Sequence, residues 1–183
     1  TAGPVTSSAS LTALNSLIMA QGNILMPGKT FLLGTSAAIP GTLAYTSGWV
    51  EGTFSRWAAP SQNGADLLFP VGDNSTGRSF TLNFSDISSA GILSVNFTGG
   101  PPATTGLPVF EDIYVFNNLF PEGYWQLSKN AAFAFSGSYN LKLIPAGFTT
   151  YPIDTNTRIL SRPAASDWTL NGTHAAGSPA MLY

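Results

Sequence analysis

Apolar and polar residues alternate along the middle and the end of the chain. In residues 79–85 every second side chain is Phe or Leu, and the positions between them are Ser, Thr or Asn. Residues 92–98, 139–143 and 168–170 follow the same alternation. A period of two with one polar face is typical of antiparallel strands that pack over a shared core. The pattern therefore predicts an all-β fold, an antiparallel β-sandwich.

Two further features belong to the predicted core, and a third predicts a turn. Residues 113–116 are apolar on both faces, which suits a central strand. Trp125 and Trp168 each open an alternating segment, so we expect both in the core. Pro70 and Gly72 are typical turn residues, the glycine through a positive φ. They predict a chain reversal between a strand ending at residue 69 and the strand that begins at residue 80.

The first third of the chain carries short apolar bursts separated by glycines and prolines. In residues 11–57 the turn signals recur at intervals of roughly 8–12 residues, which is a strand–turn–strand rhythm. A few rungs of a β-solenoid would give the same rhythm, although no repeat of fixed length stands out. Residues 11–20 have some helical character, and strand is favoured there.

These patterns divide the chain into three parts. We expect a tail or arm over residues 1–10, a short β-rich or solenoid-like section over residues 11–58, and the β-sandwich over residues 59–183. Residues 11–183 are expected to form one continuous domain.

Charge is scarce throughout the chain. It has 7 basic and 9 acidic residues among 183, or 9% charged, where a soluble domain has roughly 25%. Scattered basic residues and a net charge of −2 argue against a nucleic-acid partner. No apolar run approaches the ~20 residues of a membrane-spanning helix. The first residues, Thr1 onward, contain no basic segment, so we expect a mature product or an excised fragment.

The residues required for common catalytic sites are missing. The absence of cysteine excludes disulfides, thiol catalysis and thiolate metal sites. His174 is the single histidine and lies in a glycine-rich turn, without a second metal ligand or a nucleophile motif nearby. We interpret it as a loop residue and expect no enzyme.

Paired carboxylates are the remaining catalytic possibility, since glycoside hydrolysis needs two acids across a cleft. Glu111 and Asp112 are adjacent, but neighbouring side chains on a strand point to opposite faces. Four other acids are free to meet in space, namely Glu51, Asp73, Glu122 and Asp154. Residues 73–75 and 154–156 also offer oxygen ligands, without the glycine and closing glutamate of a calcium loop. We expect no cofactor, with weak structural calcium binding left open.

Sugar recognition is an alternative function. Trp49 and Trp57 are less constrained by the alternation than the other tryptophans, and exposed tryptophans on β-sandwiches stack on sugar rings. We favour a core or interface position for both. Four N-x-S/T sequons, at Asn74, Asn83, Asn96 and Asn171, are acceptors for glycans only in a source that has the transferase.

Short motifs follow one another in a familiar order. They are GWVEGTFSR at residues 48–56, LFPVG at 68–72, GYWQL at 123–127, SYNLKL at 138–143, RIL at 158–160 and WTLNGT at 168–173. Over residues 11–183 the chain resembles β-rich regions of surface and secreted proteins of the Bacteroidetes, many of them exported by the type IX secretion system. The resemblance implies a bacterial adhesin, gliding or surface-layer protein without catalytic residues. Such regions usually continue into a C-terminal sorting domain, so we expect a processed subunit or part of a larger protein.

The uncharged outer faces predict self-assembly. A strand edge without lysine exposes backbone groups that another strand can pair with. Residues 1–10 and the apolar run behind them are expected to supply a strand to a neighbour through Val5, Leu11, Leu14, Leu17 and Ile18. We therefore expect a non-enzymatic extracellular protein, a subunit of a surface filament or layer. The alternatives are an adhesin-like or carbohydrate-binding domain with surface glycans as partners, or a glycosylated monomer.

Overall fold

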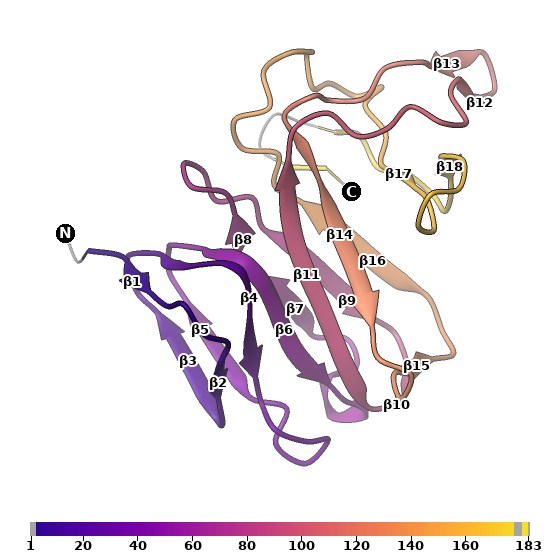
Figure 1. Ribbon diagram of the computed structural model, residues 1–183. Helices are drawn as coiled ribbons and strands as arrows, with labels where there is room; N and C mark the ends of the chain where they lie inside the picture. The colour runs from indigo at the N-terminus through magenta and orange to yellow at the C-terminus, as the bar shows by residue number, and fades with distance from the viewer. Residues whose placement is uncertain (1–2, 178–180, 183) are drawn as a thin grey trace.

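Strands form two layers with the core between them (Figure 1). The computed structural model describes residues 3–177 and 181–182. Apart from one short 3-10 helix, η1 (Pro60–Gln62), this part of the chain contains strands, turns and loops and no α-helix. The predicted all-β, sandwich-like fold is confirmed.

The first layer is a seven-stranded sheet in which β4, β6 and β11 are the long inner strands. Its members are β1 (Val5–Thr6), β2 (Leu11–Ala13), β4 (Ile24–Leu33), β6 (Val50–Ala58), β8 (Val71–Gly72), β11 (Gly91–Gly99) and β14 (Gly123–Lys129). Both β1 and β2 pair with β4, β4 pairs with β6, and the order continues through β11 to β14.

The second layer contains two smaller sheets. One is the pair of β3 (Ser16–Met19) and β5 (Thr42–Tyr45), and the other joins β7 (Asp66–Phe69), β9 (Phe80–Phe84) and β16 (Tyr139–Leu143). Three two-stranded sheets complete the fold: β10 (Ile87–Ser89) with β15 (Ala134–Phe135), β12 (Val109–Glu111) with β13 (Tyr114–Phe116), and β17 (Leu160–Ser161) with β18 (Thr169–Leu170).

The N-terminal section is a short solenoid of parallel strands. Val5 is the partner of Ile24, Ile24 of Val50, and Val50 of Val71, so the chain returns to the same position of the first layer in successive coils. Between these returns it crosses to the second layer, where β3 and β5 also pair in parallel. The intervals between the four partners are unequal, which explains why the sequence shows no repeat of fixed length.

Glycines allow the coils to stack closely at one corner. Gly48 has φ of +94°, and a Cβ at this position would lie 1.9 Å from the carbonyl oxygen of Gly22 in the preceding coil. A side chain here would meet backbone, which has no room to move aside.

After β8 the chain reverses and the pairing becomes antiparallel. As predicted, β7 and β9 pair in antiparallel register, Leu67 opposite Leu82. Gly72 does not have the positive φ that was expected, and its Cβ position is instead blocked by the carbonyl oxygen of Thr76 at 2.3 Å. Along β11 the alternation holds: Leu93, Val95 and Phe97 are buried and the residues between them face outward.

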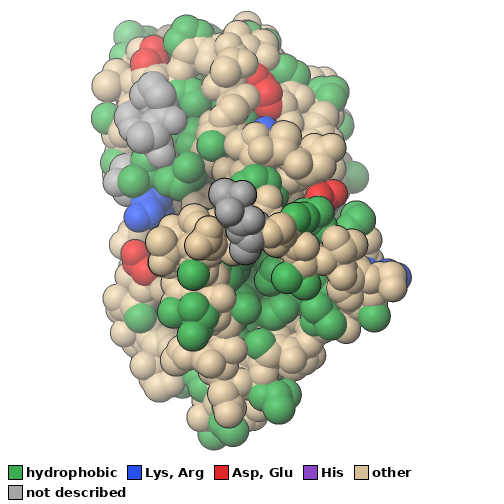
Figure 2. Space-filling view, turned by 90° about the vertical axis from the view of Figure 1, so that its left-hand side faces the viewer, with side chains coloured by type: hydrophobic (Ala, Val, Ile, Leu, Met, Phe, Trp, Pro, Cys, Tyr) green, Lys and Arg blue, Asp and Glu red, His purple; other side chains and the backbone are tan. Residues whose placement is uncertain are grey.

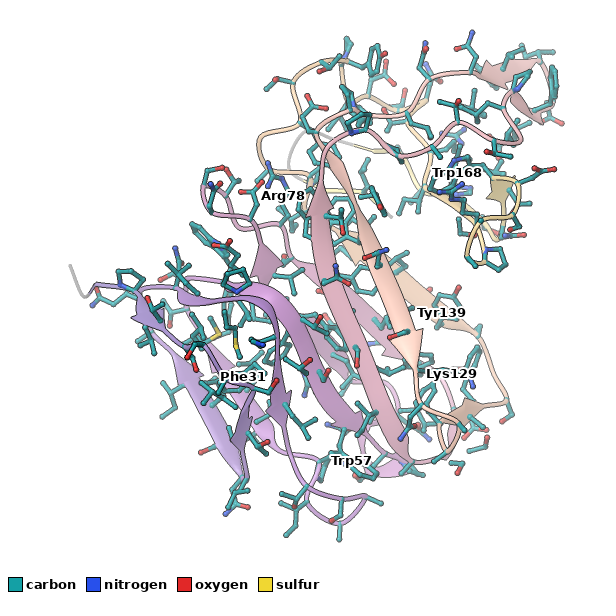
Figure 3. All side chains as sticks on the ribbon, in the orientation of Figure 1. Phe31, Trp57, Arg78, Lys129, Tyr139 and Trp168 are labelled. Carbon is teal, nitrogen blue, oxygen red and sulfur yellow. The ribbon has the colours of Figure 1, made fainter. Side chains whose placement is uncertain are left out.

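Phenylalanines connect the two layers through the core (Figure 3). Phe31 and Phe54 from the first layer have ring centroids 5.8 Å apart, and Phe54 contacts Phe69 of the second layer at 6.1 Å. Phe69 contacts Phe80 at 6.1 Å, and all four rings are buried. Phe54 is fully buried and lies on β6, which pairs with both the coils and β11.

Two predictions for the core are wrong. Residues 113–116 are not a central strand, because β13 pairs only with β12 among the described strands and Ile113 is 88% exposed. Trp168 lies outside the core, under the Arg162 guanidinium (4.8 Å to the ring), and donates to the Ala103 carbonyl. Trp125 does pack against the core, with its ring 5.4 Å from that of Phe97.

Candidate functional site

All five residues predicted to mediate assembly lie in the first coil. We call residues 5–19, which contain β1, β2 and β3, coil 1. Its exposed apolar residues are Val5 (59%), Leu14 (60%) and Ile18 (74%), whereas Leu11 and Leu17 are half-buried against the core. Figure 2 shows this side of the molecule, where hydrophobic side chains gather near the centre of the face.

The strands of coil 1 each have one unpaired side. Among the described residues β1 and β2 pair only with β4, and β3 pairs only with β5. Strand β1 lies within the segment predicted to be an arm, and here it is bonded to the sheet, Val5 N–H donating to the Asn23 carbonyl at 2.8 Å. Residues 3–28 contain no charged side chain. Coil 1 therefore lacks the lysines that usually protect an exposed strand edge.

At the other end of the sandwich lies a cleft of about 1270 Å³, lined by β14, β16 and residues of the segments 114–120 and 148–171. Leu127 (47% exposed) and Tyr139 (49%) lie on its two sides, and Phe80 and Leu82 line it from the second layer. In Figure 3 Tyr139 and Lys129 mark this end. Sequence reasoning did not find the cleft, because the alternation identifies strands without showing which of them are edges.

The two tryptophans considered for sugar binding lie apart. The Trp49 indole donates to the Asp73 carbonyl at 2.6 Å, and its ring packs against Gly72 and Gly77. Trp57 lies near the far end of β6, where it pairs with Ile92 (Figure 3). Eight residues of strand separate them by roughly 26 Å, so they do not form one stacking platform.

The carboxylates are held in separate structural contacts. Glu111 pairs with Arg158 at 2.6 Å and lies 4.0 Å from His174, whose Nε2 contacts the Ile159 carbonyl at 3.0 Å. Glu122 accepts hydrogen bonds from the backbone N–H groups of residues 149 and 150, both at 2.7 Å. Although partial burial raises the pKa of Glu122, these hydrogen bonds outweigh it and leave the pKa below its usual value.

Arg78 and Asp73 form a clamp where the coils meet the antiparallel strands. Arg78 is buried, pairs with Asp73 and donates to the Ala146 carbonyl at 2.9 Å. Its guanidinium lies 4.5 Å from the ring centroid of Phe97. Partial burial raises the pKa of Asp73, but hydrogen bonds from Ser75, Arg78 and residue 76 outweigh this and lower it overall.

The outer face of the first layer is polar and uncharged in its centre. Ser55 and Ser94 hydrogen-bond across β6 and β11 at 2.7 Å, and Asn96 donates to Gln126 across β11 and β14 at 2.9 Å. The sequon asparagines differ in setting: the Asn83 amide donates to the Gly64 carbonyl and to Asp66, whereas Asn74 is exposed in a loop. The side-chain amide of Asn171 donates to Ser161 and Thr169.

The described part of the chain contains neither a cluster of metal ligands nor a helix that could span a membrane. No group of three or more His, Asp or Glu residues in residues 3–177 and 181–182 is arranged to hold a metal ion. Within the same ranges no helix is long and apolar enough to cross a membrane.

No protein-family model, curated protein or solved structure matches this chain. The surfaces of the chain itself therefore support the functional proposal: the edge at coil 1 and the cleft beside β14 and β16.

Proposed function

We propose that this is a non-enzymatic structural protein of the cell exterior, a subunit of a surface filament or layer that assembles through its strand edges. The observation that carries the proposal is coil 1, which exposes Val5, Leu14 and Ile18, carries no charge, and in the described residues has strands with one unpaired side. Backbone N–H and C=O groups on such an edge form hydrogen bonds with a strand of another molecule.

The extracellular location is supported by the low charge and by the resemblance of the motif order to bacterial surface proteins. Surfaces that are covered by neighbouring subunits do not need charge for solubility. A carbohydrate-binding or adhesin role has weaker support. The Trp49 indole is hydrogen-bonded to the Asp73 carbonyl, and Trp57 lies too far from Trp49 for the two rings to stack on one sugar.

The proposal is tested by sedimentation velocity of the full chain and of two matched variants. Ile18→Lys places a charge on an exposed residue of the coil 1 edge, and Ile113→Lys places one on an exposed residue of the β12–β13 hairpin. We expect the unmodified chain and Ile113→Lys to form oligomers whose size grows with concentration, and Ile18→Lys to stay monomeric. An unmodified chain that remains monomeric at all concentrations would contradict the proposal.

A further inference from the structure

We infer that coil 1 binds the open end between β14 and β16 of a second copy, so that the copies join head to tail. This inference rests on the proposed function and identifies the partner surface that it requires. It follows from the construction of the two ends, the direction of their strands, their size and their charge.

The two ends have the same construction. Coil 1 ends the first layer with β2 and the second layer with β3, and the opposite end presents β14 in the first layer and β16 in the second (Figure 1). In the described residues β2, β3 and β14 are each paired on one side only, and β16 is bridged on its second side at Leu143 alone, by Leu182, which leaves residues 139–142 unpaired there. A second copy can therefore extend both layers at once.

The strands at the two ends also run in compatible directions. In the first layer β2, β4 and β6 are parallel, while β11 is antiparallel to β6 and β14 is antiparallel to β11. Strand β14 thus runs in the direction of β2. In the second layer β16 runs in the direction of β7, since both are antiparallel to β9.

A copy displaced along the layers without rotation therefore brings β2 beside β14 in parallel orientation and β3 beside β16. Parallel pairing is the mode that β2 and β3 already use within the coils. A contact between two different surfaces that does not close into a ring generates an open filament. This geometry accounts for a filament rather than a symmetric dimer.

The side chains at the two ends are chemically compatible. Leu127 and Tyr139 are half-exposed at the mouth of the cleft, and Leu11 and Leu17 point their partly buried side chains toward the core at the edge of coil 1. Docking would cover these apolar groups on both copies. Burial of apolar surface is the main favourable term in association.

Charge and size favour a second copy as the partner. The only charged residues of β14 and β16 are Lys129 and Lys142, and the rest of the cleft wall adds Asp154, Arg158 and Arg162. Coil 1 has no charged residue, so no like charges meet. Lys129 is already bonded to the Phe133 carbonyl at 3.0 Å. Coil 1 together with its flanking residues, 3–23, has 21 residues, and a standard interface uses roughly 20–30 residues per partner.

The test is a mixing experiment with full-length chains that are each blocked at one end. Ile18→Lys blocks coil 1 and leaves the cleft intact, whereas Leu127→Lys blocks the cleft and leaves coil 1 intact. Tyr139→Lys provides a second cleft block on the other strand, and Ile113→Lys is the control outside both surfaces. Sedimentation velocity measures the mass of each variant alone and of equimolar mixtures.

We expect the three blocked variants to be monomeric alone, and each cleft variant to form a dimer with Ile18→Lys that does not grow further. Dimer formation also shows that both blocked chains are folded. Two cleft variants mixed with each other should stay monomeric. If Leu127→Lys and Tyr139→Lys both form oligomers like the unmodified chain, the cleft is not the partner surface, although the proposed function stands. If the blocked chains stay monomeric when mixed, the head-to-tail contact is wrong. If the unmodified chain is monomeric, both proposals fail.

Discussion

The two halves of the sandwich bury their core in different ways. In the N-terminal coils, parallel strands repeat at unequal intervals, Val5, Ile24, Val50 and Val71 occupying equivalent positions. In the other half, β11 pairs with β14 and β9 pairs with β16 in antiparallel register, and β11 alternates between core and outer face. A coil obtains its neighbours from the preceding and following coils, and among the described residues coil 1 is paired with the following coil alone. Because the N-terminal half is built of coils, it ends at coil 1 in a strand edge that is uncharged and, among the described residues, unpaired.

The largest effect on stability is expected from Phe54→Ala, which tests whether the two halves of the sandwich unfold as one unit. Phe54 is fully buried on β6, the strand that belongs to both halves. Phe54→Ala should lower the free energy of unfolding by about 4 kcal/mol through lost burial and the cavity that remains. Circular dichroism and tryptophan fluorescence, followed during urea unfolding, should still give coincident transitions.

Phe110→Ala is the matched control, since Phe110 is 64% exposed on the β12–β13 hairpin. It should change stability by less than about 0.5 kcal/mol. Separate transitions of the two probes in Phe54→Ala would show that the coils and the antiparallel half are independent units.

A smaller effect tests the close stacking of the coils. Gly48→Ala introduces both a positive-φ alanine and a Cβ 1.9 Å from the Gly22 carbonyl oxygen, and should cost about 3 kcal/mol. Gly28→Ala has a positive φ of +70° but open space around its Cβ, and should cost only about 1 kcal/mol. Chemical denaturation measures the free energy of unfolding of both variants. Equal decreases would mean that Gly48 and the Gly22 carbonyl do not approach each other as closely as the structure shows.

The smallest effect concerns the clamp between the halves. Because the pKa of Asp73 is lower in the folded protein than in the unfolded chain, its carboxylate stabilises the fold above about pH 4. This contribution is lost as the pH falls through the folded-state pKa. The difference in stability between the unmodified chain and Asp73→Asn should therefore be largest near neutral pH and shrink at pH 2–3. A difference that is constant with pH would show that Asp73 does not stabilise the fold through its charge.

Sequence patterns predicted the antiparallel half better than the rest of the molecule. Alternation in residues 79–85 and 92–98 predicted the strands β9 and β11 and their buried faces. This worked because every second side chain of a strand that packs on a core is buried and apolar. The solenoid could only be offered as an alternative, since the coils differ in length. The expectation for residues 113–116 was wrong, because an apolar segment shows a preference for burial and not the presence of neighbouring strands.

The candidate site was predictable only in part. The apolar residues Val5, Leu14 and Ile18 were expected in the assembly segment, and the structure places all three on coil 1 with exposed side chains. The cleft at the opposite end depends on which strands are the last in each layer, β14 and β16. That is a property of topology, which no local pattern in the sequence contains.

The central claim is that the chain assembles by adding copies end to end. Light scattering of the unmodified full chain over a wide range of concentrations tests it most directly, with electron microscopy of the same samples. We predict that the mean mass rises continuously from 19.1 kDa without a plateau at two chains, and that elongated particles appear. A constant mass of one chain, or a plateau at two, would contradict the account.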